Sequence, residues 1–309
     1  MSLPDWFHDL AARLSNAGRW GADDRIGTIN FIDDEARRRA AACITKGKAF
    51  SLALPLDAMQ GIQTGIMPLR INPLRTMTQI NLPLLGDPSA FCTSDDIVTM
   101  GLQAATHWDG LGHVSYDGKL YNGVAASTIT EFGSTVLGIH NIATMVSRGV
   151  LLDVTRALGV PRLEASYPIT AADLDAAEAL ARIEVLPGDI VLVRTGQMEF
   201  LANGDKPGYG QSSPGLTVGT AQWFRDRDVA AVATDTLPLE VIPCEDPTVF
   251  LPVHLLHLVA MGMTQGQNFV LDELALDCAA DGVYTFFLDA SPQPFVNAVG
   301  SPVNPVAIK

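Results

Sequence analysis

A helix followed by a wholly apolar strand is the sequence feature that most constrains the fold. Residues 169–182 (ITAADLDAAEALAR) are rich in alanine and leucine, and Thr170 followed by Asp173 matches a helix-capping pair. A Pro-Gly-Asp turn at 187–189 precedes the run IVLVR at 190–194, which predicts a fully buried strand. Helices that alternate with buried strands are typical of α/β proteins.

The same alternation extends over most of the chain. We expect further helices at 4–15, 34–43, 220–226, 250–261 and 273–280, and further strands at 28–32, 50–54, 134–140, 150–154, 229–234 and 284–288. No internal repeat, coiled coil or linker-like tract interrupts these elements, and proline-rich loops leave room for antiparallel pairing. The economical prediction is one mixed α/β domain over residues 1–309.

Residues 55–88 depart from this pattern, because they are rich in proline and carry isolated apolar residues. A long irregular stretch in a compact protein is often a lid or a binding loop. The alternative is that its methionines fill gaps in the core. The apolar residues concerned are Met59, Ile62, Ile66, Met67, Met77 and Ile80.

The charge balance excludes several classes of partner. A formal net charge of −14 and the lack of a Lys/Arg cluster argue against a surface for nucleic acid or anionic membranes. The first residues lack the basic start and apolar core of a signal peptide, and no uncharged apolar run is long enough to cross a bilayer. The four cysteines lie far apart, which is typical of small buried residues in a reducing cytoplasm.

The candidate functional stretch is residues 100–123 (MGLQAATHWDGLGHVSYDGKLYNG). If it is extended, Gln103, His107, Asp109 and His113 share one side, because side chains alternate along a strand. A few mixed nitrogen and oxygen ligands with room for water are what a catalytic divalent metal requires. A bare His-x-Asp is also common by chance, so spacing alone leaves an ordinary structural role open.

The stretch resembles the signature His-x-Gly-Thr-His-x-Asp-x-Pro-x-His of the cyclase-type metal-dependent hydrolases, which include bacterial kynurenine formamidase and isatin hydrolase. Here it reads QAATHWDGLGH, from Gln103 to His113. The resemblance also covers RWGADDRIGTIN, YDGKLYNG, GDIVLVRTG, TDTLPLEV, VHLLHLVAMGM and VGSPVNPVAI. It implies a swivelling β/β/α fold, in which helices flank a mixed barrel-like sheet, and assembly as a homodimer.

Three positions depart from the signature. Gln103 replaces the first ligand histidine, Ala105 replaces the glycine before the threonine, and Leu111 replaces the proline before the last histidine. A glutamine carbonyl oxygen is a weaker and uncharged ligand. This substitution shifts the expected metal from zinc towards harder ions such as manganese or magnesium. We expect one divalent ion, Mn²⁺ or Zn²⁺, held by His107, Asp109 and Gln103.

Further along the chain, the resemblance implies a histidine at a helix start and a glutamate beyond the helix end. His254 matches the histidine, and the glutamate position falls on Gln267. Members with two metals use that carboxylate, so Gln267 favours a single-metal site. The alternative is a protein that has lost activity.

The mechanism that the resemblance implies is hydrolysis by a metal-activated water. His113 or His254 would be the general base, since imidazole titrates near neutral pH. Thr106 would orient a ligand or water, whereas Trp108 and His257 are expected to be packing residues. No Gly-x-Ser-x-Gly or nucleotide-binding motif is present in the sequence.

The expected substrate is a small neutral or weakly charged amide, lactam or lactone, shielded by apolar loops. The chain would then be an intracellular metal-dependent hydrolase of a C–N or C–O acyl bond. Two other functions stay open: a binding protein that keeps the pocket without turnover, and a lyase or cyclase that uses the metal as a Lewis acid.

Overall fold

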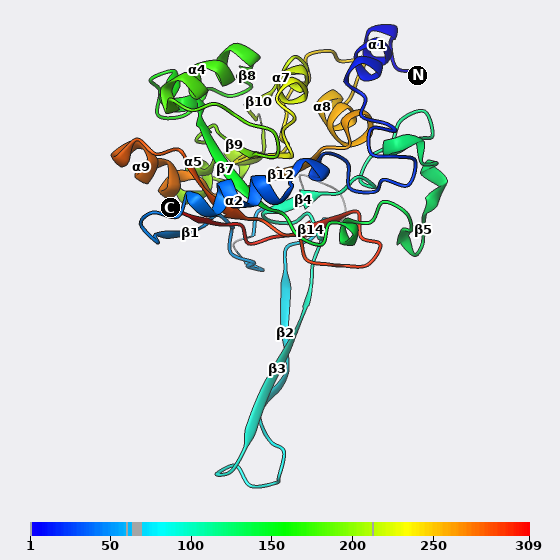
Figure 1. The fold of residues 1–309 in the computed structure, drawn as a ribbon. Helices are drawn as coiled ribbons and strands as arrows, with labels where there is room; N and C mark the ends of the chain where they lie inside the picture. Colours follow the sequence, from blue (N-terminus) through cyan, green and yellow to red (C-terminus); the bar gives the residue numbers. More distant parts are fainter. Residues whose placement is uncertain (1, 60, 64–69, 212) are drawn as a thin grey trace.

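The computed structural model describes residues 2–59, 61–63, 70–211 and 213–309. In these residues, nine strands form one mixed sheet that curls into a half-barrel (Figure 1). In spatial order they are β1 (Ala49–Ser51), β15 (Val306–Ile308), β13 (Thr285–Asp289), β7 (Val146–Asp153), β9 (Ile190–Arg194), β11 (Ala231–Thr234), β12 (Thr264–Gln267), β4 (His107–Asp109) and β14 (Gly300–Pro302). The prediction of a mixed α/β fold is therefore confirmed.

The four central strands β7, β9, β11 and β12 run parallel, and the strands on either side are antiparallel to their neighbours. Among these, β9 (IVLVR) and β11 (AVAT) are almost wholly apolar because both faces of the sheet are covered, whereas the buried β12 (TQGQ) is polar. Along β9, Val191 and Val193 enter the core on one face, whereas Ile190 and Leu192 enter the core on the other.

Helices supply the cover on each face. The first core takes apolar residues from α1 (Asp5–Leu14), α4 (Ala171–Ala181), α7 (Thr220–Asp226) and the segment formed by α8 (Pro252–His254) with the π-helix η5 (Leu255–Met261). The second core takes residues from η1 (Gly27–Phe31) and α9 (Asp272–Asp281), and α2 (Asp34–Ala42) packs on β7 and β13. The expected capping box of Thr170 with Asp173 is present at the start of α4.

Short elements connect these layers: η2 (Tyr121–Gly123), η3 (Ala126–Thr128), β5 (Ile129–Thr130), β6 (Gly133–Ser134), η4 (Ile139–Asn141), α3 (Val154–Ala157), β8 (Pro168–Ile169), α5 (Met198–Ala202), α6 (Lys206–Gln211) and β10 (Gly215–Leu216). No helix in the described part of the chain is long and apolar enough to cross a membrane.

Several expected elements were wrong in type or extent: the strand expected at 50–54 is only β1 at 49–51, and the strand expected at 150–154 begins already at 146. Residues 28–32 form the 3₁₀ turn η1 instead of a strand, because Thr28 donates its backbone N–H to the Gly262 oxygen and its hydroxyl to the Ala230 oxygen. The strand expected at 134–140 is only the two-residue β6 followed by η4. The helix expected at 250–261 begins at Pro252 and widens into a π-helix.

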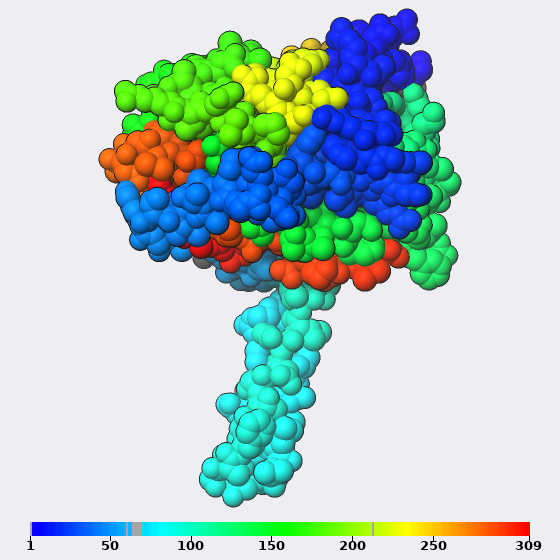
Figure 2. All heavy atoms as spheres, viewed as in Figure 1, coloured from blue at the N-terminus to red at the C-terminus, as the bar shows by residue number. Residues whose placement is uncertain are grey.

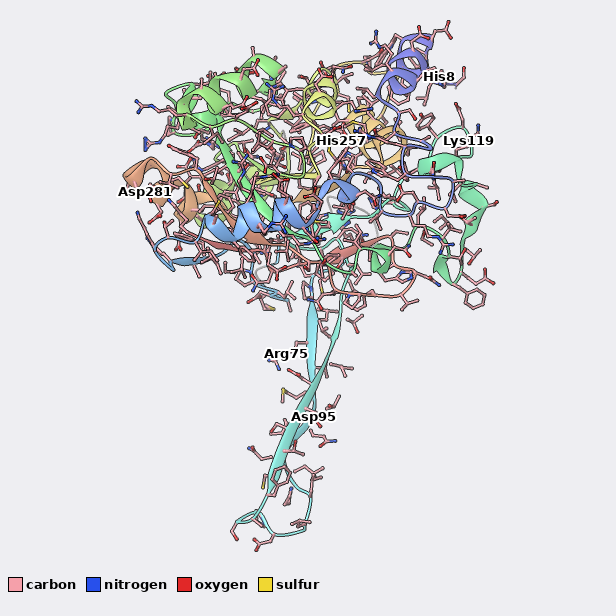
Figure 3. The ribbon with its side chains drawn as sticks, in the orientation of Figure 1. His8, Arg75, Asp95, Lys119, His257 and Asp281 are labelled. Atoms are coloured by element: carbon pink, nitrogen blue, oxygen red, sulfur yellow. The ribbon has the colours of Figure 1, made fainter. Side chains whose placement is uncertain are left out.

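The stretch 55–88 is only partly an irregular loop. β2 (Leu74–Pro83) pairs with β3 (Cys92–Thr99) in a long hairpin, which we call the arm. The arm projects well away from the rest of the protein (Figures 1 and 2), and Arg75 and Asp95 lie along it (Figure 3). Of the apolar residues named above, Ile62 is buried, Met59, Met77 and Ile80 are exposed, and Ile66 and Met67 lie outside the described residues.

Candidate metal centre

The three-residue strand β4 carries the two central candidate ligands. It lies between β12 and β14, where His107 pairs with Gln267 and Asp109 pairs with both Gln265 and Gly300. Because side chains alternate along a strand, His107 and Asp109 point to one face and Trp108 points to the other. Trp108 is fully buried, contacts the Phe269 ring at 5.1 Å, and donates its indole N–H to the Ala290 oxygen at 2.8 Å. Its expected packing role is confirmed.

His107 is held in one tautomer. Its Nδ1 lies 2.7 Å from the Ala105 carbonyl oxygen, which only accepts, so Nδ1 carries a proton; in the neutral ring the free lone pair is then on Nε2. Nε2 is buried and has no hydrogen-bond partner among the described residues, and the same holds for Asp109 Oδ1. These two unpartnered atoms lie 3.5 Å apart.

Two further histidines lie beside the Asp109 carboxylate. His113 Nε2 is 3.6 Å from Oδ1, and His254 Nε2 is 3.8 Å from Oδ2. Burial raises the pKa of Asp109, but the charges of His113 and His107 outweigh it and hold that pKa far below its usual range. These neighbours favour the ionised form of Asp109.

The extended arrangement that we expected across 103–113 is limited to β4. A turn closed by the His113 backbone N–H on the Gly110 oxygen (2.9 Å) brings His113 back towards Asp109. Residues 103–106 also turn, and Gln103 makes no hydrogen bond to another described residue. Its amide packs over Gly300, where an added Cβ would lie 2.5 Å from Gln103 Nε2. Gln103 thus lies beside the residue that pairs with Asp109, and it does not touch the cluster directly.

Gln267 occupies the centre of the cluster, as its alignment with the family's glutamate position predicts. Its Nε2 donates to Asp109 Oδ2 at 2.7 Å and lies 3.1 Å from His254 Nε2. The second contact is a hydrogen bond only if His254 Nε2 is unprotonated and accepts. The Gln267 amide thus lies between the Asp109 carboxylate and the His254 imidazole.

Sequence reasoning missed the partner of His254. Glu240 Oε1 accepts from His254 Nδ1 at 2.5 Å, and its two oxygens also accept from the backbone N–H groups of Val253 and His254 at 2.9 Å. Burial lowers the pKa of His254, but Glu240 raises it above its ordinary value. Glu240 belongs to the block TDTLPLEV, which carried the resemblance without revealing this role.

Gln265, which also lies near the cluster, was missed as well. Gln265 Nε2 lies 3.5 Å from Asp109 Oδ2, and its oxygen faces Nδ1 of the fully buried His257 at 3.2 Å. His257 is thus a packed residue, as expected (Figure 3).

Asp109 raises the pKa of His113, but burial and the nearby charges of His254, His107 and Arg70 outweigh it and lower that pKa.

The residues present fit one metal ion in part. Among the described residues, no three or more His, Cys, Asp or Glu side chains form a ready-made metal site. The orphaned pair is nevertheless suited to one ion, because ligands bound tetrahedrally at about 2.1 Å are separated by about 3.4 Å. The His107–Asp109 separation of 3.5 Å matches this spacing. An amide ligand such as Gln103 is compatible with this finding, because the finding concerns only His, Cys, Asp and Glu side chains.

A cavity of about 550 Å³ reaches His254 from the outside. It is lined partly by apolar side chains of Val114, Tyr116, Phe250 and Leu255. Of the cluster residues, His254 alone lines this cavity, together with the polar residues Ser2, Ser115 and Asp117.

Comparison with known proteins gives a consistent result. A sequence family described as "Putative cyclase" matches residues 23–241. The crystal structure of a novel cyclase superposes with a TM-score of 0.87 and 39% identity, covering 96% of this chain and 99% of the other. The comparison with curated proteins found no match.

More distant structures share the fold. Isatin hydrolase A from Labrenzia aggregata has a TM-score of 0.61 at 17% identity, covering 87% of this chain and 94% of the other. A predicted metal-dependent hydrolase from Bacillus stearothermophilus has a TM-score of 0.52 at 17% identity, covering 84% and 97%.

Proposed function

This chain belongs to the cyclase family, and from that premise we propose that it is a metal-dependent hydrolase of a C–N or C–O acyl bond in a small organic substrate. The observation that carries the proposal is the pair of buried, unpartnered atoms His107 Nε2 and Asp109 Oδ1, which face the partly exposed His113. Unsatisfied buried polar atoms are costly, so a pair of them indicates a missing partner. Fold relatives described as metal-dependent hydrolases support the same class.

His107 and Asp109 would hold the metal ion, with Gln103 as a third ligand after a change of its side-chain rotamer. When bound, a divalent ion lowers the pKa of a coordinated water and polarises a carbonyl group. Because the donor set is one imidazole, one carboxylate and one amide, it suits manganese at least as well as zinc.

A single ion is favoured by the position of Gln267. A carboxylate at position 267 would be available to a second cation, but here Gln267 Nε2 donates to Asp109 Oδ2 at 2.7 Å and lies 3.1 Å from His254 Nε2. An uncharged amide beside Asp109 supplies no second carboxylate for a cation.

His113 is the better candidate for the general base. Its imidazole makes no hydrogen bond to a described residue, its side chain is 21% exposed, and its lowered pKa favours the neutral ring, which can accept a proton. His254 is constrained on both sides, by Glu240 at Nδ1 and by Gln267 at Nε2. Its role is to hold the Gln267 amide against Asp109.

The substrate class extends this proposal. Lactams, lactones and formamides each present a carbonyl carbon for attack by water, and relatives named isatin hydrolase act on one such compound. The largely apolar lining near His254 suits a small organic substrate of low charge.

The test is elemental analysis of the purified protein beside His107→Ala, after incubation with Mn²⁺ or Zn²⁺. His8→Ala is the matched control, because His8 lies on α1 with a partly exposed side chain that pairs with Asp117 and not with a residue of the cluster. We expect about one equivalent of metal in the wild type and in the control, and its loss in His107→Ala. A screen of isatin, simple lactones and formanilide should then show turnover that only His107→Ala abolishes.

A binding protein without turnover is the second candidate, favoured by the two amides at Gln103 and Gln267. It would show ligand binding by calorimetry that survives His107→Ala. An absence of bound metal in the wild type would overturn the hydrolase proposal.

A further inference from the structure

A buried chain of hydrogen bonds leads from His107 away from the metal face. The Tyr209 hydroxyl donates to Asn268 Oδ1 at 2.6 Å, and Asn268 Nδ2 donates to the Ala105 carbonyl oxygen at 3.0 Å. The same oxygen accepts the His107 Nδ1 proton at 2.7 Å. Tyr209, Asn268 and His107 are all fully or almost fully buried, so water does not compete for these bonds.

Asn268 is clamped to the segment that precedes His107 at a second point. Its backbone oxygen accepts the Thr106 hydroxyl at 2.5 Å, and its backbone N–H donates to the Thr236 oxygen at 3.1 Å. It adopts φ +61°, a left-handed conformation that asparagine tolerates better than most residues. Because it directly follows Gln267, two consecutive residues serve the site: Gln267 contacts Asp109, and Asn268 anchors Ala105 and Thr106.

The donors and acceptors along this chain of hydrogen bonds can be assigned in only one way. The asparagine oxygen only accepts and its NH₂ only donates, so Tyr209 must donate and Ala105 must accept. Both lone pairs of the Ala105 oxygen are then used, one by Asn268 and one by His107. Burial raises the pKa of the Tyr209 phenol, so the hydroxyl stays protonated as a donor.

We propose that Tyr209 and Asn268 are positioning residues that set the tautomer and ring direction of His107, so that Nε2 is presented to the metal. This inference rests on the proposed function. Groups that orient a metal-ligating histidine typically change metal affinity by about 10- to 100-fold when they are removed.

The first test is the dissociation constant for Mn²⁺ in Tyr209→Phe, which removes a single hydroxyl. Tyr167→Phe is the matched control, because the Tyr167 hydroxyl donates to Asp173 near the start of α4, away from the site. We expect about tenfold weaker binding in Tyr209→Phe and no change in the control. An unchanged dissociation constant in Tyr209→Phe would overturn the proposal.

The second test needs no metal. In ¹⁵N-histidine NMR of the metal-free protein, the His107 signals, assigned with His107→Gln, should report the Nδ1–H tautomer in the wild type. Asn268→Gly accepts the left-handed backbone while it removes the amide, and should give a mixture of tautomers. A purely structural role would lower the unfolding midpoint and leave the tautomer unchanged, which would overturn the inference. If the wild type binds no metal, the proposed function fails, while this spectrum still tests the positioning.

Discussion

At the scale of single residues, the site is defined by which polar atoms have partners. Gln267 Nε2 donates to Asp109 Oδ2 and lies beside His254 Nε2, whereas Asp109 Oδ1 and His107 Nε2 have no hydrogen-bond partner among the described residues. The Asp109 carboxylate thus has one oxygen that accepts a hydrogen bond from an amide and one oxygen that accepts none from the described residues. We regard this asymmetry as the structural reason for a single ion.

Replacing that amide tests the asymmetry. In Gln267→Glu, two carboxylates would lie at about the 2.7 Å that now separates the amide nitrogen from Asp109 Oδ2. Such a pair repels unless a proton or a cation lies between them. We expect bound Mn²⁺ to rise from about one to about two equivalents, and the metal-free variant to be less stable than the wild type. Elemental analysis and thermal unfolding in EDTA measure both effects, with Gln222→Glu on the exposed side of α7 as control. A stoichiometry that stays at one would contradict this explanation.

His257 carries a prediction about pH. Burial lowers its pKa to about 3 from an ordinary 6.5, so between these values the unfolded chain binds a proton that the folded chain does not. The free energy of unfolding therefore falls as pH falls below 6.5, by about 1.4 kcal/mol per pH unit from this residue.

His257→Gln should remove that contribution. We expect the loss of stability between pH 7 and pH 5, measured by urea unfolding of the metal-free protein, to be about 2 kcal/mol smaller than in the wild type. His8→Gln, an exposed control, should keep the wild-type difference. Equal pH dependence in all three proteins would show that His257 is not neutral in the folded state.

At the scale of elements, predictability follows from burial. The run 190–194 was predicted with its correct bounds, because a strand covered on both faces contains only apolar residues and one end charge. β2 and β3 were missed, because both of their faces are largely exposed and no alternation of apolar and polar residues is required. The strand expected at 28–32 was wrong because contacts with residues 230 and 262, distant in sequence, decide the local turn.

The candidate site, like the secondary structure, could be predicted only where a local sequence pattern determines the geometry. His107 and Asp109 share a face because they are two residues apart in a real strand. Gln103 fell outside the strand, so the alternation argument did not apply to it. Glu240, Asn268 and Tyr209 act through contacts between segments far apart in the sequence, which periodicity cannot reveal.

The turn η1 makes a testable contact with η5. Gly27 has φ +57°, and an added Cβ would lie 1.9 Å from the Gly262 backbone oxygen. Gly27→Ala therefore combines backbone strain with a clash that no side-chain movement relieves, and we expect a loss of at least about 3 kcal/mol in unfolding free energy. Gly18→Ala is the matched control, since φ is +77° and an added Cβ meets nothing within 4 Å, so only about 1 kcal/mol should be lost. Urea unfolding measures both, and equal losses would contradict the clash.

At the scale of the whole molecule, the arm is the feature that a single chain does not explain. It exposes nine large apolar side chains: Leu74, Met77, Ile80, Leu82, Leu84, Leu85, Phe91, Ile97 and Val98. A two-stranded hairpin standing alone is marginally stable in water, and exposed apolar strands favour association. The arm (Figure 2) therefore needs a surface to pack on.

We propose that this surface belongs to a second copy of the chain. A groove of about 550 Å³ at the root of the arm is lined by Leu54, Leu56, Val98, Phe295 and Val303, among others. The arm and this apolar groove adjoin on one protomer. In a dimer with a two-fold axis, each arm would lie along the groove of the partner, and the two identical contacts would close the assembly. The arrangement agrees with the homodimer that the resemblance implies.

Charge placed on the arm should break this dimer. Ile80 and Leu85 are 70% and 77% exposed, so Ile80→Asp with Leu85→Asp should leave the folding of the protomer intact while opposing burial of the arm. By light scattering after gel filtration, we expect the wild type at twice 32.9 kDa and the double variant at 32.9 kDa. Phe132→Asp, which changes an equally exposed residue (75%) outside the arm, should remain dimeric. A wild type that elutes as a monomer would refute the assignment, and a dimer that survives both arm substitutions would place the interface elsewhere.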